Sequence, residues 1–158
     1  MKRFAFFLVL LALVAGLSAR PAQLKNFVEL LNALQHGEEV SMVAHYGRAT
    51  LMLDGQEGGP SPDATGGMKL DTWEYFAPMI MGNPMGFISF GECKLIENPL
   101  GEGYVYNYVR VRVMDNGTVE VTARYLNATT FEAQMDETYV GKMSIGGNDQ
   151  SPYLFFAE

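Results

Sequence analysis

Residues 104–126, YVYNYVRVRVMDNGTVEVTARYL, contain two runs of alternating apolar and polar residues on either side of Asp115-Asn116-Gly117. This alternation predicts the two strands of a β-hairpin. A two-residue Asn-Gly turn would place Val113 opposite Glu120 and bring the apolar face of one strand against the polar face of the other. A three-residue loop with its glycine in the left-handed conformation places Val113 opposite Val119, and we predict this second register.

The predicted register gives the hairpin two distinct faces. It pairs Val111 with Val121, Val109 with Ala123, Arg112 with Glu120, and Tyr108 with Arg124. The valine face, which we predict to be part of the core, carries Val105, Val109, Val111, Val113, Val119 and Val121. The opposite face carries Glu120, Thr122 and a set of residues that we call the Tyr/Arg face: Tyr104, Tyr106, Tyr108, Arg110, Arg112 and Arg124.

The Tyr/Arg face is the candidate binding surface in the sequence. Tyrosine rings stack on sugars or apolar rings at a low cost in conformational entropy, and arginines bind carboxylate or sulfate groups in a bidentate manner. The alternative interpretation is that these residues form ordinary cross-strand pairs on a solvated surface.

The first 19 residues predict a secretory signal peptide. Lys2 and Arg3 precede an apolar run over residues 4–14, and the small residues Ser18 and Ala19 follow. The run is shorter than the ~20 apolar residues of a bilayer-spanning helix, which argues against a permanent anchor. We expect cleavage after Ser18 or Ala19, a secreted or periplasmic location, and no stable membrane anchor after cleavage.

The remaining segment, residues 20–158, has the length of a single domain that can bury its own core. Loss of Lys2 and Arg3 leaves nine basic residues against 18 acidic ones, so the formal net charge changes from −7 to −9. This balance argues against nucleic acid or an anionic membrane surface as a partner, because both attract positively charged proteins.

Hydrophobic periodicity predicts one helix followed by strands. An amphipathic helix that ends at Gly37 is indicated by the helical spacing of Leu24, Phe27, Val28, Leu31 and Leu34. From residue 39 onward, turns rich in glycine and proline separate seven or eight short runs that are typical of strands. We predict a mainly β (α+β) fold, in which an antiparallel meander curls or closes into a barrel-like sheet and the N-terminal helix packs on it.

The chain contains no nucleophile elbow, zinc-protease motif, EF-hand loop or Cys-x-x-Cys pair. We therefore expect no enzymatic activity, no cofactor and no metal site. A single cysteine, Cys93, allows no intrachain disulfide, and its apolar surroundings favour a buried thiol over an interchain disulfide or a reactive group. The sequons at Asn116 and Asn127 predict N-glycosylation if the producing cell glycosylates.

Several segments in this order resemble the VirK family. They are a helix ending in ALQHG (33–37), ATGGMKLDTWEYF (64–76), GFISFGECKLI (86–96), YNYVRVRVMDNGTVEVTARYL (106–126) and ETYVGKM (137–143). The resemblance covers nearly the whole mature chain and implies a small exported protein with one compact domain. It implies no reaction, because the molecular activity of the family is uncharacterised.

The resemblance also bears on two small residues. Relatives often carry cysteines at the positions of Ala49 and Gly141. If these cysteines form a disulfide in relatives, the Cα atoms of Ala49 and Gly141 lie within ~7 Å of each other here.

We therefore expect a secreted or periplasmic, non-catalytic binding or host-interaction protein of the VirK type, with an unknown protein, glycan or small molecule as its partner. The alternative is a lipocalin-like carrier of a small apolar or amphipathic ligand. A closed barrel with an empty interior would favour the carrier, whereas a filled core with exposed tyrosines would favour recognition at the surface. An enzyme would require His45, Cys93 or a pair of carboxylates gathered in a cleft.

Overall fold

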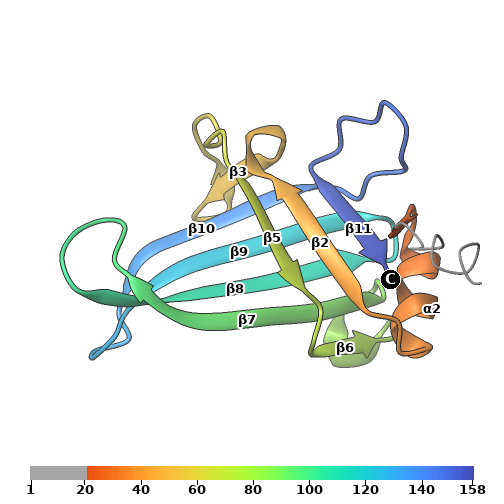
Figure 1. Cartoon of the computed structure of the whole chain (residues 1–158), viewed down its shortest axis with the longest axis horizontal. Helices are drawn as coiled ribbons and strands as arrows, with labels where there is room; N and C mark the ends of the chain where they lie inside the picture. Colours follow the sequence, from red (N-terminus) through yellow and green to blue (C-terminus); the bar gives the residue numbers. More distant parts are fainter. Residues whose placement is uncertain (1–20) are drawn as a thin grey trace, which may run out of the picture.

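The computed structural model describes residues 21–158, so the predicted signal peptide lies outside the described residues. The described chain is mainly antiparallel β-structure with one α-helix, as predicted (Figure 1). The helices are α2 (Phe27–Gln35) and the short 3-10 turns η1 (Tyr46–Arg48) and η2 (Ile80–Gly82). The strands are β1 (Ala22–Leu24), β2 (Val40–His45), β3 (Thr50–Leu53), β4 (Gln56–Glu57), β5 (Thr65–Lys69), β6 (Trp73–Phe76), β7 (Phe87–Glu97), β8 (Tyr104–Met114), β9 (Thr118–Asn127), β10 (Ala133–Lys142) and β11 (Tyr153–Ala157).

The strands form two sheets. The larger sheet has seven strands in the order β4-β3-β10-β9-β8-β7-β6, and the smaller sheet has four in the order β1-β11-β2-β5. In Figure 1 the smaller sheet crosses one face of the larger sheet obliquely. The parts of β7 to β10 on the left of that view extend beyond the smaller sheet.

The prediction of one curled or barrel-like sheet with seven or eight strands is wrong. The described residues form eleven strands in two sheets, and neither sheet is closed. The reason is that β11, from the end of the chain, pairs with both β1 and β2 and so builds a second sheet. Because this second sheet covers part of the valine face, the larger sheet does not need to close to bury it.

The register of the central hairpin is confirmed. Val113 lies opposite Val119, and the other predicted pairs follow in order from Arg112 with Glu120 to Tyr108 with Arg124. Gly117 has a φ of +77°, as the three-residue loop requires.

The core lies where the two sheets overlap. Five residues of the valine face have no exposed surface, and four of them belong to this core: Val111, Val113, Val119 and Val121. The fifth, Val105, is buried outside it. From the larger sheet, Phe90 packs edge-on against Phe155 of β11 at a ring separation of 6.3 Å. The buried Tyr153 hydroxyl of β11 donates to the Tyr139 carbonyl oxygen of β10 at 2.9 Å, which ties the two sheets together by a hydrogen bond.

Helix α2 is shorter than predicted. Leu24 belongs to β1, and the helix begins after Asn26, whose side chain accepts a hydrogen bond from the Glu29 N–H. Val28 is 62% exposed, so its assignment to the buried stripe is wrong, and Leu30 is buried instead. The predicted left-handed stop at Gly37 is confirmed by its φ of +77°.

Candidate binding groove

The uncovered part of the larger sheet forms the floor of a groove of about 510 Å³. Its floor comes from β8, β9 and β10, and one wall comes from η1 and the segment that leads into β5. The floor residues are Asn107, Val109, Ala123, Tyr125, Met135 and Glu137. The wall includes Tyr46, Ala64 and Gly66, while Leu100 lies at the opposite rim.

The groove is a direct continuation of the valine face. Asn107 lies opposite Tyr125, and Tyr125 lies opposite Met135, so these three residues share the inner face of the sheet with Val109 and Ala123. Val109 and Ala123 are partly buried and pack against the core. The inner face therefore changes from apolar core to half-buried polar surface beyond the point that the smaller sheet covers.

Three tyrosines and one carboxylate gather in this groove, and we call them the Tyr–Glu cluster: Tyr46, Tyr125, Glu137 and Tyr139. The rings of Tyr46 and Tyr139 lie 4.8 Å apart, tilted by 58°. A Cβ atom at Gly66 would lie 3.1 Å from the Tyr46 ring, so the absence of a side chain there gives this ring its place under β5.

The hydroxyl of Tyr139 donates a hydrogen bond to the carboxylate of Glu137. Burial and then this contact with a negative charge raise the pKa of Tyr139 well above its ordinary value. Burial, followed by the proximity of Tyr125, also raises the pKa of Tyr46. Both phenols therefore stay protonated at neutral pH and remain able to donate hydrogen bonds.

One wall of the groove is also an open sheet edge. Strand β5 pairs only with β2 among the described strands. The Tyr46 N–H donates to the Ala64 carbonyl oxygen, and the Leu70 N–H donates to the Val40 carbonyl oxygen, so the even-numbered residues direct their backbone groups toward β2. Because these directions alternate along a strand, the backbone groups of Thr65, Gly67 and Lys69 face away from β2.

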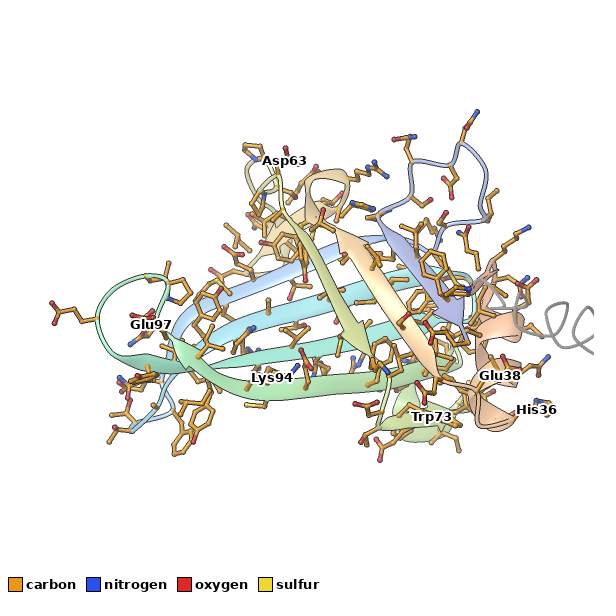
Figure 2. The ribbon with its side chains drawn as sticks, in the orientation of Figure 1. His36, Glu38, Asp63, Trp73, Lys94 and Glu97 are labelled. Atoms are coloured by element: carbon orange, nitrogen blue, oxygen red, sulfur yellow. The ribbon has the colours of Figure 1, made fainter. Side chains whose placement is uncertain are left out.

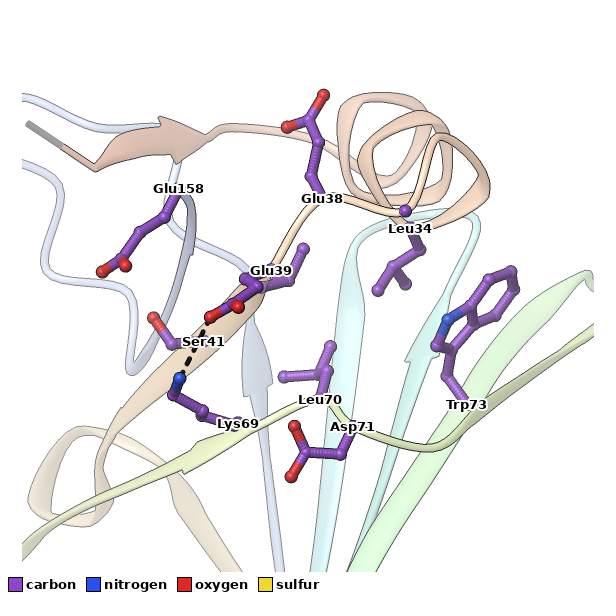
Figure 3. A pocket seen from close by; sticks show the side chains of 11 residues that line it. Leu34, Glu38, Glu39, Ser41, Lys69, Leu70, Asp71, Trp73 and Glu158 are labelled. Atoms are coloured by element: carbon purple, nitrogen blue, oxygen red, sulfur yellow. Dashed lines mark hydrogen bonds and ion pairs between the residues drawn. The ribbon is translucent and has the colours of Figure 1, made fainter. Parts of the chain in front are cut away.

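A second hollow of about 270 Å³ lies at the other end of the smaller sheet, beside the end of α2 (Figure 3). It is lined by Leu34, Trp73 and several charged residues. The Lys69 ammonium lies 3.1 Å from the Glu39 carboxylate, and both side chains are mostly exposed. Because its charges are solvated and partly paired, this hollow is a weaker candidate than the groove.

The Tyr/Arg face lies on the outer side of the larger sheet, opposite to the groove. Its arginines already have partners there: Arg124 pairs with Asp136 at 3.0 Å, and Arg110 approaches Glu120 at 4.0 Å. Arg112 lies over the ring of Phe87 at 5.3 Å. Tyr106 stacks on Phe131 with a ring separation of 5.8 Å, while Tyr104 is 65% exposed and Tyr108 lies opposite Arg124. The structure thus brings these residues together, and their role in binding stays a prediction.

Other sequence-based expectations concern single residues. Cys93 is exposed on the outer side of the larger sheet, opposite Tyr108, so the prediction of a buried thiol is wrong. Cys93 lies on β7, which is followed in the sheet order by β6 alone. Strand β6 pairs with β7 only from Phe87 to Phe90, so β7 forms the edge of the sheet at Cys93. Asn116 lies in the hairpin loop and Asn127 at the end of β9. The side chain of each accepts hydrogen bonds from backbone N–H groups of the following turn, and their glycosylation stays a prediction.

Ala49 and Gly141 adjoin the end of the ladder between β3 and β10. The last pair of this ladder is Val140 with Thr50, and Gly141 and Ala49 are the next residues beyond it on the two segments. Opposite residues in an antiparallel ladder have Cα atoms about 4.5–5.5 Å apart, so a register continued by one residue would satisfy the limit of ~7 Å, and the separation itself stays a prediction. A Cβ atom at Gly141 would overlap the ring of Pro152, so in this chain the proline occupies the space of a longer side chain.

The described residues contain no group of three or more histidine, cysteine, aspartate or glutamate side chains that could hold a metal ion. Within residues 21–158, no helix has the length and apolar character needed to cross a membrane.

The groove residues were not predicted as a site. Two of them, Asn107 and Tyr125, lie opposite each other in the central hairpin, where they interrupt the apolar alternation of the valine face. Polar residues that continue an apolar face are the signal that could have indicated an uncovered part of the sheet. Tyr46 and Glu137 come from other elements, and only the fold brings them to the same place.

Comparisons with known proteins agree on one family. A family model described as VirK protein matches residues 23–131. The crystal structure of lpg1832, a VirK family protein from Legionella pneumophila, superimposes with a TM-score of 0.65 at 15% sequence identity. The match covers 85% of this chain and 98% of that one, and at this identity it shows the fold alone. No curated protein matches the chain significantly.

Proposed function

Because this chain belongs to the VirK family, we propose that it is an exported, non-catalytic binding protein that engages a partner of the host or of its surroundings in the groove. The observation that carries this proposal is the groove itself. Its floor is built by the same strands as the core, and rigid elements of this kind hold binding residues in fixed positions.

Export is supported by the N-terminal sequence, in which a basic pair, a short apolar run and small residues follow one another. A role in binding is supported by the residues of the groove. Tyrosine and asparagine side chains offer both contact area and hydrogen bonds, while the half-buried Val109, Ala123 and Met135 offer apolar surface.

The Tyr/Arg face is the second candidate surface for the same function. Its exposed Tyr104 and the Tyr106–Phe131 stack favour contact with a partner. We rank it after the groove because its arginines are engaged with Asp136, Glu120 and Phe87. A lipocalin-like carrier remains the alternative function, although its main requirement was a closed barrel and the two described sheets are open.

The proposal is tested by presenting the mature protein with a library of random displayed peptides and with an array of glycans. We expect ligands whose binding is lost when Ala123→Trp fills the groove floor. Ala64→Trp, at the exposed rim of the groove, gives a second blocked variant that does not disturb the core. The control is the double variant Tyr106→Ala/Arg112→Ala on the outer side, which we expect to keep binding. The proposal is contradicted if no ligand is found whose binding is lost in both blocked variants, Ala123→Trp and Ala64→Trp. If only the double variant on the outer side loses binding, the partner binds the Tyr/Arg face.

A further inference from the structure

We propose that the groove accepts a lysine or arginine side chain from an extended segment of a partner protein, with Glu137 as its counter-ion. This inference rests on the proposed function, because it specifies the chemistry of the partner at the same site.

The first argument is the charge of Glu137. Its carboxylate receives one hydrogen bond, from the Tyr139 hydroxyl, and no lysine or arginine among residues 21–158 lies within ion-pair distance of it. The inner face also carries Lys94, which lies on β7 opposite Asn107 of β8 and is three strands away from Glu137 (Figure 2). Its ammonium is already bound to Glu92 at 2.6 Å. The groove therefore holds a negative charge that lacks a cationic partner in the described part of the chain.

The second argument is the aromatic surface around that charge. Tyr46 and Tyr125 are half-buried and line the groove, and the buried ring of Tyr139 packs against that of Tyr46. Aromatic faces attract cations through their quadrupole, and a half-buried site strengthens this attraction because less water competes. A carboxylate bordered by tyrosines thus favours an alkylammonium or guanidinium group over a neutral or anionic one.

The third argument is the charge of the whole protein. The chain has a formal net charge of −7, which becomes −9 without the predicted signal peptide. A protein of this charge attracts cationic partners and repels anionic ones over distances of about the Debye length. The groove and the electric field of the whole protein therefore both favour a cationic partner.

The open edge of β5 favours an extended segment over a free amine. The outward-facing backbone groups of Thr65, Gly67 and Lys69 continue along β5 from the groove wall and are available to a partner strand. A strand added there would direct alternate side chains toward the sheet floor, where the Tyr–Glu cluster lies. A free amine would use the cluster but not this edge.

The inference is tested with pools of short blocked peptides that share one fixed central residue: lysine, arginine, acetyl-lysine or glutamine. The mature protein is mixed with each pool, and retained peptides are quantified by mass spectrometry. We expect the lysine and arginine pools to be retained about tenfold or more over the acetyl-lysine pool, because a charge-assisted hydrogen bond is lost on acetylation. Added salt should reduce this preference, and a simple alkylamine should bind more weakly than the peptides.

Glu137→Gln is the test variant, because glutamine can still accept the Tyr139 hydrogen bond while it removes the charge. We expect this variant to lose the preference for basic pools. Asp136→Asn is the matched control, and it should keep the preference. It removes the same charge from the residue before Glu137 in β10, whose side chain lies on the outer face.

Equal retention of basic and neutral pools, or a preference that survives Glu137→Gln, would overturn the cationic inference. The proposed function would still be supported if other ligands bind the protein and fail to bind the variants Ala123→Trp and Ala64→Trp. If the glycan array instead yields the only groove-dependent ligands, the partner is a carbohydrate and the inference is wrong. If no ligand depends on the groove, the proposed function itself fails.

Discussion

Single residues set the geometry of the central hairpin and of the groove. Gly117 has a φ of +77°, and a Cβ atom there would meet no other atom within 4 Å. Its role is therefore conformational rather than steric, since L side chains avoid this backbone region. Gly66 has the opposite role, because it leaves room for the Tyr46 ring.

Gly117→Ala should destabilise the protein by about 1 kcal/mol, because alanine is strained in the left-handed region. Gly59→Ala is a matched control: a Cβ atom there also meets nothing within 4 Å, but its φ is not in the left-handed range. We expect the control to leave the free energy of unfolding unchanged or slightly raised. Urea unfolding of both variants measures the difference, and an equal effect of the two substitutions would show that the loop does not need a left-handed residue.

Tyr153 should make the fold sensitive to alkaline pH. Its hydroxyl is buried, and burial raises its pKa above the ordinary value of 10.0. The unfolded chain therefore releases this proton at lower pH than the folded chain. The contribution to stability is complete below about pH 10 and declines as the pH rises above that value.

Tyr153→Phe should reduce the alkaline decline in the free energy of unfolding by up to about 1.4 kcal/mol per pH unit. At neutral pH it should cost about 1 kcal/mol, because the Tyr139 carbonyl loses a hydrogen bond. Tyr104→Phe, at an exposed position, should change neither quantity. Urea unfolding at a series of pH values gives the slopes, and an identical slope for Tyr153→Phe and the unchanged protein would refute the assignment.

At the scale of elements, the local sequence pattern was enough to predict the pairing of the hairpin strands but not the pairing of the smaller sheet. The register of β8 and β9 follows from alternation and loop length, because both strands are adjacent in the chain. By contrast, β1 pairs with β11 across almost the whole described chain, and no local signal specifies that pairing. The groove was missed for the same reason, since its position depends on where the smaller sheet ends.

The ladder between β3 and β10 allows an engineered disulfide. The double variant Ala49→Cys/Gly141→Cys should be destabilised when reduced, because any side chain at position 141 meets the ring of Pro152. Addition of Pro152→Ala should relieve this contact and let the disulfide form, with a gain of about 4 kcal/mol on oxidation for so long a loop. Intact mass and thiol titration detect the bond. Failure of the triple variant to oxidise would mean that positions 49 and 141 are too far apart to bridge.

At the scale of the whole molecule, two open sheets meet over only part of the larger one. This arrangement gives a filled core at one end of the sandwich and an acidic, tyrosine-lined groove beyond it. The outer side of the larger sheet is occupied by charge pairs instead. The two faces of the same strands therefore differ in their charges: charge pairs lie on the outer face, whereas the Glu137 carboxylate on the inner face has no lysine or arginine partner among residues 21–158.

The proposed export predicts a defined mature chain. Protein recovered from the culture medium or the periplasm should begin at Ala19 or Arg20, because cleavage is expected after Ser18 or Ala19. Intact-mass measurement of the exported protein identifies the first residue. Recovery of the full-length chain from the membrane fraction would instead indicate an uncleaved anchor.

The central claim is that the partner binds in the groove and along β5, and amide hydrogen exchange tests it most directly. The measurement compares the free mature protein with its complex with the most strongly retained lysine peptide. We predict slower exchange at Thr65, Gly67 and Lys69, whose N–H groups lie on an open edge in the free protein, and unchanged exchange across the Tyr/Arg face. Protection at Tyr106, Arg112 and Arg124, with no change in β5, would contradict the account.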